Sequence, residues 1–422
     1  MDEKKKIAII GSGISGLFSA FELHQKYHVT VFEKASRLGG HTDTHDLIID
    51  GKPVRVDSGF IVFCEKYYPN FCRMLNQLEV ESESTSMSFS AFNEQSNIVY
   101  NATSINRLFC QRRNLFKPSF YRMVFDIVRF YITSKSVLNS SNSQMTVKQY
   151  LDQNKYSTQF KDDHLYPMIS ALWSATPEFV AQFPIRHLIE FLSKHGMMNV
   201  VLRPNWKVIR NGSNSYIEAL QQKIECEWLT DSPVKSVVRS NGRVKLQTNA
   251  ASYDFDAVIF ATHSDQALNI LEDPSDDERS ILGSIKYQQN HMVVHTDERL
   301  MHPNKRSWAS WNTKVPSQLN PNSLECCTAT YWMNLLQNLC LSSNVFATLN
   351  SHDKINPEKI LLETHYSHPI FTPESVAAQK RKNEINGNNN TYYVGAYWGW
   401  GFHEDGARSA VEATSLIKQQ LN

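Results

Sequence analysis

The chain has 422 residues, and its 43 lysines and arginines balance 42 aspartates and glutamates to give a net charge of +1. This balance excludes a nucleic-acid binder that works through bulk charge, because such binding needs a basic excess or a clear basic stripe. Hydrophobic residues make up 41% of the chain and aromatic residues 11%, which is typical of a globular enzyme of about two or three domains. No run of about 18 apolar residues and no secretory signal is present, so we expect neither a membrane span nor export.

The first forty residues predict a strand, a helix and a second strand. Residues 6–10 (KIAII) are apolar throughout, as in a strand that is buried on both faces. The segment GSGISG follows, and apolar residues then recur at helical spacing as far as Phe21. A second strand is predicted over 28–33, which closes a βαβ unit.

The rest of the chain alternates between helical and mixed regions. Polar, serine-rich sequence between 76 and 90 indicates a crossing between domains, and 105–194 is predicted to be rich in helices. The later predicted elements are a helix from Gly212 to Leu220, strands at 234–238, 244–247 and 257–260, a mixed region over 264–384, a strand at 392–397 and a helix at 405–420. The turn Ser240-Asn241-Gly242 predicts that the first two of these strands form a hairpin.

The seven cysteines are an odd number and include no C-x-x-C pattern. This usage indicates a reducing compartment without a disulfide framework or a zinc site, so we expect a cytoplasmic protein that holds no metal. We expect the adjacent pair Cys326 and Cys327 to pack as small hydrophobes in an apolar strand.

The glycine motif Gly11-x-Gly13-x-x-Gly16 lies between the first strand and the first helix. The first glycine permits a tight turn, the second lets the backbone approach a pyrophosphate, and the third lets helix and strand pack closely. A pyrophosphate would then bind the N–H groups at the helix N-terminus. Glu33, at the end of the second strand, would accept hydrogen bonds from an adenosine ribose. The spacing predicts a dinucleotide-binding site, with a purely structural glycine turn as the alternative.

The sequence after Glu33 carries a longer pattern, E-x-x-x-R-x-G-G, which contains Arg37, Gly39 and Gly40. With this pattern the chain resembles the flavin-containing amine oxidase superfamily. Further matching segments are Asp57-x-Gly59-Phe60, Gly212-Ser213-x-x-Tyr216, Ala261-Thr262-His263, Tyr393-Val394-Gly395 and Glu404-Asp405-Gly406-Ala407. The runs Tyr68-Pro69-Asn70, Met87-Ser88-Phe89-Ser90, His263-Ser264-Asp265-Gln266-Ala267-Leu268 and Tyr331-Trp332-Met333-Asn334 resemble one bacterial branch of predicted NAD/FAD-binding proteins, associated with cyclopropane and modified fatty-acid synthesis.

The resemblance implies an α/β fold in which a Rossmann-type, glutathione-reductase-like FAD-binding domain is joined to a mixed α+β substrate domain. The FAD-binding domain is expected over 1–75, 200–265 and 385–422, and the substrate domain over 76–199 and 266–384. The last helix region lacks the cysteine that links flavin in some relatives, so non-covalent FAD is expected, with attachment at His403 as the alternative. The residues expected to bind FAD are Gly11, Ser12, Gly13, Gly16, Glu33, Lys34, Arg37, Gly39, Gly40, Val234, Gly395, Glu404, Asp405, Gly406 and Ala407.

One departure from the family concerns the two tyrosines that flank the substrate nitrogen in classical amine oxidases. Phe402 and His403 stand just before the E-D-G-A turn, where a tyrosine is expected, and this puts amine oxidation in doubt. The residues expected to face the substrate are Tyr397, Trp398, Trp400 and Phe402, with a role as plain walls of the flavin pocket as the alternative.

The candidate catalytic residues are Lys286 and His403. Lys286 is the rough counterpart of a family lysine that contacts flavin N5 through water, although a lysine at the start of a strand is more often solvated. A histidine near neutral pH can also act as a general base. The candidates are His195, His291 and His295, and the alternative for each is an ordinary hydrogen-bonded histidine.

The segment 107–135 interleaves basic and aromatic side chains, and its apolar residues from Phe116 to Tyr131 recur at helical spacing. Such a segment could lie on an anionic bilayer, which would place the protein peripherally at the inner membrane surface. The alternative is an ordinary core-facing helix with arginines on its wet side.

The leading functional hypothesis is an FAD-dependent oxidoreductase that transfers a hydride from an organic substrate, an acyl chain or lipid, to flavin N5. One alternative is a flavin amine oxidase that acts on a small amine. A second is a redox-neutral flavin-dependent isomerase or mutase, or a flavin-bound partner protein without turnover. The sequence leaves the oligomeric state open.

Overall fold

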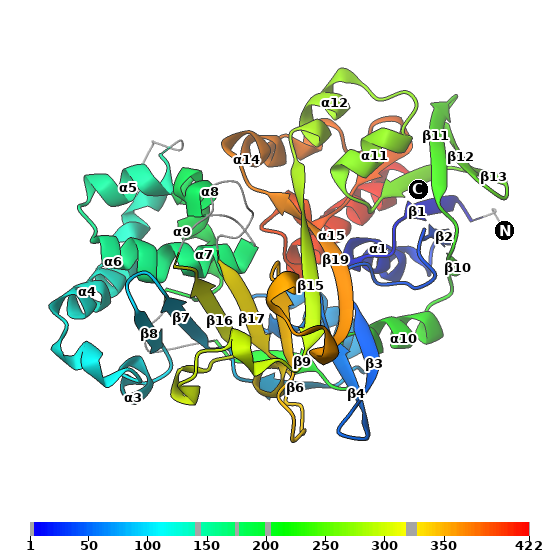
Figure 1. The fold of residues 1–422 in the computed structure, drawn as a ribbon. Helices are drawn as coiled ribbons and strands as arrows, with labels where there is room; N and C mark the ends of the chain where they lie inside the picture. Colours follow the sequence, from blue (N-terminus) through cyan, green and yellow to red (C-terminus); the bar gives the residue numbers. More distant parts are fainter. Residues whose placement is uncertain (1–3, 140–144, 174–176, 199–203, 318–326, 422) are drawn as a thin grey trace.

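The computed structural model describes residues 4–139, 145–173, 177–198, 204–317 and 327–421. Two sheets form its two main parts. Figure 1 shows β1, β2, α1 and α15 on one side of the molecule and a group of helices, α3 to α9, at the opposite end, with the long strands β15 and β19 between them.

The first sheet has five parallel strands in the order β10-β2-β1-β14-β20. Its strands are β1 (Lys6–Ile10), β2 (His28–Phe32), β10 (Glu227–Leu229), β14 (Ala257–Phe260) and β20 (Thr391–Tyr393). The central strands are buried on both faces because helices cover one face and a β-meander covers the other. The strands predicted at 6–10, 28–33 and 257–260 are therefore confirmed to within a residue, and with them the α/β fold class. The last predicted strand is shorter than expected, because the chain turns at Gly395 into a 3-10 turn, Ala396–Trp398.

Helices and a meander cover this sheet. The helices are α1 (Ile14–Leu23), α2 (Pro69–Gln77), α10 (Asn214–Lys223) and α15 (His403–Gln420). The meander is formed by β11 (Val234–Ser240), β12 (Arg243–Thr248) and β13 (Ser252–Phe255). The predicted hairpin is confirmed, with Asn241 and Gly242 both at positive φ (50° and 72°), as a tight two-residue turn requires.

The second sheet has seven strands in the order β19-β15-β18-β17-β16-β7-β8. They are β7 (Phe89–Asn93), β8 (Ile98–Asn101), β15 (Lys286–His295), β16 (Trp311–Val315), β17 (Thr328–Trp332), β18 (Phe346–Leu349) and β19 (Ile360–Ile370). Cys327 directly precedes β17 and is half-buried, so the expectation of a core strand cysteine is wrong for this residue; Cys326 lies outside the described residues.

The helix-rich stretch predicted at 105–194 is confirmed. Its helices are α3 (Ile105–Leu108), α4 (Pro118–Thr133), α5 (Val147–Gln153), α6 (Thr158–Phe160), α7 (Tyr166–Trp173), α8 (Pro177–Gln182) and α9 (Ile185–Lys194). Within the parts of the chain that the structure describes, no helix combines the length and apolarity needed to cross a membrane.

Short elements connect the two parts. The helices are α11 (Ser264–Ile270), α12 (Asp276–Gly283), α13 (Met333–Leu336) and α14 (Pro373–Lys380). The strands are β3 (Thr44–Ile49) and β4 (Lys52–Asp57), which form a hairpin, and β5 (Val62–Cys64), β6 (Ser82–Thr85) and β9 (Trp206–Ile209), which form a small sheet.

Candidate active site

The glycine loop between β1 and α1 leaves open space at one of its glycines. Gly13 precedes α1 in an extended conformation (φ −64°, ψ 175°) and no side chain caps the helix. No protein atom lies within 4 Å of the position that a Cβ of Gly13 would occupy. A Cβ on Gly16, in contrast, would lie 2.0 Å from the carbonyl oxygen of Gly11. The loop is therefore closely packed at Gly16 and open at Gly13, next to the N-terminus of α1, where an anionic group is favoured.

A second glycine turn lies against the first. Gly39 and Gly40 both have positive φ (118° and 59°). The N–H of Gly39 donates to the backbone oxygen and to Oγ of Ser12, both at 3.1 Å. A Cβ on Gly40 would lie 3.1 Å from the Cα of Gly13. The two turns together form a narrow cradle around the open space at Gly13.

Glu33 lies at the end of β2 and is buried beside this cradle. Its carboxylate accepts hydrogen bonds from N (2.9 Å) and Oγ (2.6 Å) of Ser12 and from N of Ala35 (2.9 Å). The backbone oxygen of Glu33 accepts from Ser232, two residues before Val234. The entry to the meander is thus fastened beside Glu33, as the predicted cofactor role of Val234 requires, whereas Lys34 is exposed.

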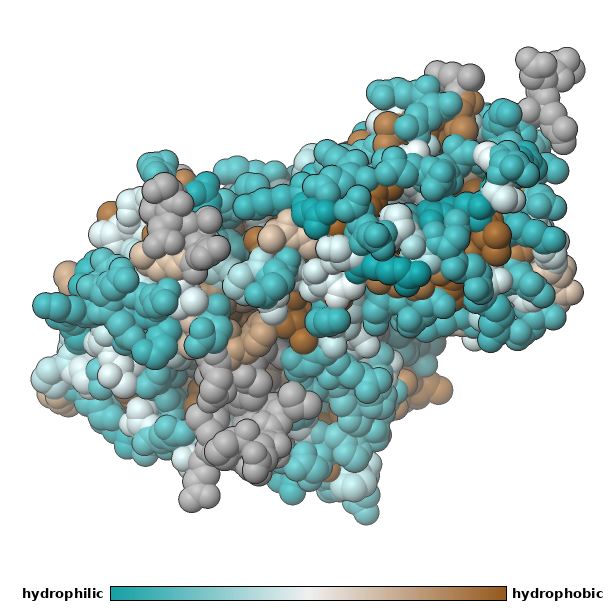
Figure 2. Space-filling model, turned by 90° about the horizontal axis from the view of Figure 1, so that it is seen from above, coloured by the Kyte–Doolittle hydropathy of each residue, from teal (hydrophilic) through white to brown (hydrophobic). Residues whose placement is uncertain are grey.

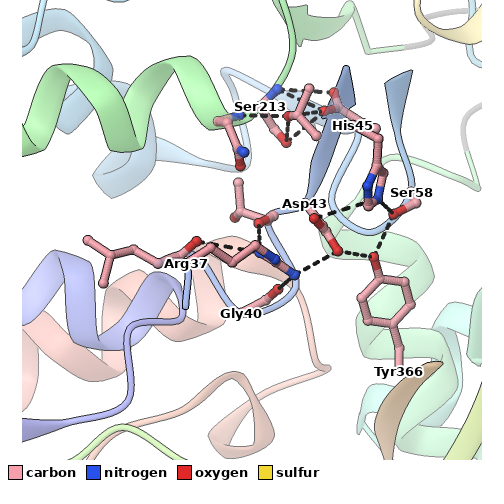
Figure 3. Close-up of polar contacts among 12 residues, drawn as sticks. Arg37, Gly40, Asp43, His45, Ser58, Ser213 and Tyr366 are labelled. Atoms are coloured by element: carbon pink, nitrogen blue, oxygen red, sulfur yellow. Dashed lines mark hydrogen bonds and ion pairs between the residues drawn. The ribbon is translucent and has the colours of Figure 1, made fainter. Parts of the chain in front are cut away.

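Arg37 closes the second glycine turn (Figure 3). Its guanidinium donates to the carbonyl oxygens of Thr42 (3.0 Å) and Gly40 (3.1 Å) and forms an ion pair with Asp43 (2.6 Å). These contacts hold the shape of the turn. The guanidinium donors of Arg37, which were expected to face the cofactor, bind protein groups and support the cradle from outside.

The network of Arg37 continues to the second sheet. Tyr366, on β19, donates to Asp43 (3.0 Å), and its hydroxyl lies 2.6 Å from that of Ser58. Ser58 in turn lies 2.7 Å from Nε2 of His45 (Figure 3). The glycine cradle of the first part of the molecule is therefore tied to strand β19 of the second part.

A group of imidazoles and phenols lies beyond Gly40; we call His41, His263, Tyr287, Tyr366 and His368 the histidine chamber. The ring centroid of His41 is 5.1 Å from that of Tyr366, 5.4 Å from that of His368 and 6.1 Å from that of His263. His263 stacks on Tyr287 at 4.3 Å. These side chains come from the second glycine turn, the end of β14, β15 and β19.

The histidines of the chamber are neutral near pH 7. Burial lowers the pKa of His41 and His263 to about 4 and that of His368 to about 3, and neighbouring positive charge, which includes other imidazoles, lowers each pKa further. Among the described residues, Nε2 of His41 has no hydrogen-bond partner. His41 nevertheless keeps part of its surface accessible, as expected for a side chain that lines a recess.

A small apolar cavity lies at His368, between the second sheet and helices α7 and α8; its volume of about 10 Å³ holds about one water molecule, so a longer ligand would require it to widen. The residues that line it are Ile169, Trp173, Phe179, Val180, Phe183, Gln288, His368, Pro369, Ile370 and Phe371. Among the described lining residues, Gln288 and His368 are polar and none is a carboxylate. Figure 2 shows one face of the molecule, which is mostly hydrophilic with smaller hydrophobic patches. His368 belongs both to the chamber and to the cavity lining, so the cavity borders the chamber, and His41 of the chamber directly follows Gly40 of the cradle.

The start of α15 is fixed by its own acidic residues. Glu404 accepts hydrogen bonds from N (3.1 Å) and Nδ2 (2.6 Å) of Asn70 and from N of Phe71 (3.1 Å), at the start of α2. Asp405 accepts from N of Trp400 (2.8 Å) and of Phe402 (3.1 Å). Both carboxylates thus fasten loops to the first turn of α15.

The backbone at the start of α15 differs from the expectation that Gly406 and Ala407 lie at its free N-terminus. The helix begins at His403, before the predicted start near Asp405, so the N–H of Gly406 already donates to the carbonyl of Phe402. Gly406 is required for packing: a Cβ there would lie 2.7 Å from side-chain atoms of Ile14 and Ser15 on α1. Gly395 has a similar role, since its Cβ would lie 2.1 Å from the ring of Tyr397.

The four aromatic residues predicted to face the substrate separate into two pairs. Tyr397 and Trp398 pack in the core beside the first sheet, where Nε1 of Trp398 donates to the carbonyl of Tyr393. Trp400 and Phe402 lie on the other side, against α9, and Phe402 stacks on Phe191 at 5.1 Å. Trp400 shares its core cluster with the cavity residue Phe371, so the structure brings the second pair, and not the first, near the cavity.

His403 and Lys286 occupy very different positions. His403 is buried beside Phe60, with a ring separation of 3.5 Å, and its Nε2 lies 3.0 Å from the hydroxyl of Thr42. Burial holds its pKa well below the usual value. Lys286 is exposed at the first residue of β15. It pairs in register with the cavity residue Ile370, and residues opposite each other in an antiparallel pair share a face. Lys286 therefore lies at the outer edge of the cavity.

The other histidines singled out in the sequence lie outside the chamber. Nδ1 of His195 contacts the carbonyl of Phe191, Nε2 of His291 lies 2.9 Å from a carboxylate oxygen of Glu363, and His295 contacts Thr348. Sequence reasoning missed His41, Tyr366 and His368. His41 directly follows the glycine pair, and Tyr366 and His368 alternate along β19, but only the tertiary contact between this turn and β19 brings them together.

The parallel sheet, the glycine cradle and the acidic residue after β2 define the class of dinucleotide-binding α/β proteins. Within this class, the chain belongs to the family described as flavin containing amine oxidoreductase, which matches residues 14–363. This family comprises flavoproteins. Among curated protein sequences, no significant match to the chain is found.

Solved structures share the fold at low sequence identity. A cyclohexylamine oxidase from Brevibacterium oxydans IH-35A has a TM-score of 0.72 at 15% identity, with 99% of each chain covered. A putative protoporphyrinogen oxidase from Exiguobacterium sp. 255-15 has a TM-score of 0.70 at 15% identity, again with 99% of each chain covered. A CLA-producing fatty acid isomerase from P. acnes has a TM-score of 0.67 at 13% identity, with 100% of each chain covered. These similarities establish the fold over the whole chain.

Proposed function

We propose that the protein binds FAD non-covalently and oxidises an apolar, acyl-chain substrate. The open space at Gly13 fits the cofactor, because it adjoins the uncapped start of α1 and is bounded by a second glycine turn. Gly13 and Gly40 would border the pyrophosphate, Glu33 would hold the adenosine ribose, and Ser12 would position Glu33 through its two hydrogen bonds. When bound, a flavin supplies an acceptor for a hydride.

The observation that carries the substrate class is the composition of the cavity beyond His368. Eight of its ten lining residues are apolar, and the remaining two, Gln288 and His368, are uncharged near pH 7. An alkyl chain gains free energy when such a surface removes it from water, about 25 cal/mol per Å². Among the described lining residues an ammonium group would find no carboxylate partner, so its desolvation cost would not be offset there. The cavity therefore favours a hydrocarbon chain over a charged amine.

Lys286 supplies a place for the polar end of such a substrate. It lies at the outer edge of the cavity, opposite Ile370, and its ammonium group is in solvent. We assign it to binding a carboxylate there. A free acyl chain would then enter with its alkyl end toward His368.

His41 is the candidate acceptor for the proton that desaturation releases. Desaturation breaks two C–H bonds and forms one C=C bond: a bound flavin would supply the acceptor for the hydride and its electron pair, and Nε2 of His41 would take the proton. This atom has no partner among the described residues, and the pKa of about 4 keeps it unprotonated. The apolar cavity excludes water from the same region.

A second candidate is redox-neutral isomerisation of a double bond in an unsaturated acyl chain. It uses the same cavity, and the fatty acid isomerase from P. acnes shares the fold over its full length. Amine oxidation remains the third candidate, supported by the family and by the fold of the cyclohexylamine oxidase.

The test is anaerobic titration of the FAD-loaded protein with saturated and unsaturated fatty acids, and in parallel with mono- and polyamines. Flavin absorbance at about 450 nm reports reduction, and mass spectrometry reports the product. We expect bleaching with an acyl chain, a product two hydrogens lighter, and no bleaching with amines.

The remaining outcomes decide between the candidates. A product with a shifted double bond and unchanged mass, formed without net bleaching of the flavin, would show that the protein is an isomerase and not an oxidoreductase. Fast bleaching by an amine would overturn the acyl assignment. Bound FAD with neither bleaching nor product from any of these compounds would favour a flavin-bound partner protein.

A further inference from the structure

Exposed apolar side chains are concentrated in one stretch of the helical end. Nine large hydrophobic residues are exposed among those the structure describes, and seven of them fall between 105 and 132. They are Ile105 (79% exposed), Leu115 (40%), Phe116 (87%), Tyr121 (48%), Phe125 (57%), Val128 (40%) and Ile132 (70%). Isolated apolar residues are normal on a protein surface, but a cluster of this kind marks an interaction site.

Helix α4 carries four of these residues on a face that points away from the core. Tyr121, Phe125, Val128 and Ile132 recur at spacings of four, three and four residues, so they form one stripe. The opposite stripe contains Phe120, Met123 and Phe130, which are all fully buried. Because the buried stripe already anchors α4, the exposed stripe is a second apolar face, and the described residues leave 40–70% of each of its side chains exposed. Figure 1 places α3 and α4 at the end of the molecule opposite β1 and β2.

The charges around this second face have one sign. The segment 105–135 contains seven basic residues, and its single acidic residue is Asp126, which gives a net charge of +6 against +1 for the whole chain. Asp126 is buried and is shared between Arg122 (3.3 Å) and Arg129 (3.1 Å). The other basic residues are Arg107, Arg112, Arg113, Lys117 and Lys135.

We propose that this surface, formed by α3, α4 and the turn between them, docks on a bilayer that carries anionic lipids. Apolar side chains would enter the boundary between headgroups and acyl chains, and the arginines and lysines would pair with lipid phosphates. A second copy of the chain is a poorer occupant, because two surfaces of charge +6 repel each other. The proposal is independent of the flavin and of turnover, so its failure would leave the proposed function untouched.

The test is cosedimentation of the purified full-length protein with vesicles of phosphatidylcholine alone or with one quarter phosphatidylglycerol. We expect binding to the anionic vesicles at low salt, weaker binding at high salt because the charges are screened, and little binding to the neutral vesicles. Removal of one basic charge in Arg107→Ala should weaken binding to anionic vesicles by roughly fivefold.

The contribution of the apolar face is tested with Ile132→Asp and a matched control, Ile48→Asp. Ile48 is similarly exposed (80%) but lies on β3, away from α4, so the control adds the same charge elsewhere. We expect Ile132→Asp to reduce binding by about tenfold or more and Ile48→Asp to retain it. Equal binding of the two variants, or no binding of the unmodified protein to anionic vesicles at low salt, would overturn the proposal. Dimers in light scattering that Ile132→Asp dissociates would assign the face to a second copy instead.

Discussion

Gly13 and Gly16 of the cradle have different proposed roles, cofactor binding and helix packing, and substitutions can distinguish the two. Gly13 borders open space, whereas Gly16 touches the Gly11 carbonyl across the start of α1. We expect Gly13→Val to fold but to lose FAD, because the side chain would fill the space that the pyrophosphate needs. The flavin released by heat or acid from purified protein measures this loss.

Gly16→Ala is the comparison. Its Cβ would overlap the Gly11 carbonyl oxygen, so we expect a lower melting temperature, not simply an empty site. Normal FAD content in Gly13→Val would show that the open space is not the pyrophosphate site.

Lys286 gives a second prediction at the residue scale. If its ammonium binds the substrate carboxylate, Lys286→Met should raise the KM for free fatty acids about tenfold or more, the effect of one lost charged hydrogen bond. The methyl ester of the same fatty acid carries no charge and serves as the matched substrate, for which KM should change little. Equal effects on acid and ester would contradict the assignment.

At the scale of elements, the crossing of α1 and α15 depends on Gly406. A methyl group there would press on Ile14 and Ser15, so we expect Gly406→Ala to destabilise the protein by about 1–3 kcal/mol in urea unfolding. Gly283→Ala is the control, because its Cβ would meet only Leu268 at 3.8 Å. This control should be neutral or stabilising by up to about 1 kcal/mol. A neutral Gly406→Ala would mean that the helices separate more easily than the packing indicates.

Elements with local signals were predictable from the sequence, and sites that depend on register were not. The glycine loop marks the boundary between β1 and α1, and Asn241-Gly242 marks the hairpin, because both need backbone angles that few residues adopt. Helix α15 begins at His403, before the predicted start at 405, because Glu404 and Asp405 accept hydrogen bonds from the backbone of neighbouring loops. The spacing of these residues in the sequence does not reveal that role. The histidine chamber joins residues more than 300 positions apart, and no local pattern encodes that distance.

The whole molecule contains many histidines that burial keeps neutral. The pKa is lowered to about 4 or about 3 for His41, His164, His187, His263, His295 and His368. In the unfolded chain these histidines bind protons below pH 6.5, and in the folded chain they do not, so stability must fall as the pH drops from 6.5 toward 4. Asp57, whose pKa burial raises to about 6, acts in the opposite direction but is outnumbered.

We therefore expect a lower urea midpoint at pH 5.5 than at pH 7.5, with each histidine contributing on the order of 1 kcal/mol. His164→Asn should make this decline shallower, because His164 lies outside the site and contacts Tyr100. A midpoint that stays constant or rises on acidification would contradict the assignment of neutral buried imidazoles.

We propose that the glycine cradle, the histidine chamber and the apolar cavity form one continuous site. The most direct test is the absorption difference spectrum of bound flavin when a long-chain fatty acid is added, in the unmodified protein and in Val180→Trp. Val180 is fully buried in the cavity wall, so a tryptophan there should fill the cavity without touching the cradle. We predict a saturable change in the flavin spectrum of the unmodified protein and no change in Val180→Trp at equal FAD content. An unchanged spectrum in both proteins, or the same change in both, would contradict the claim.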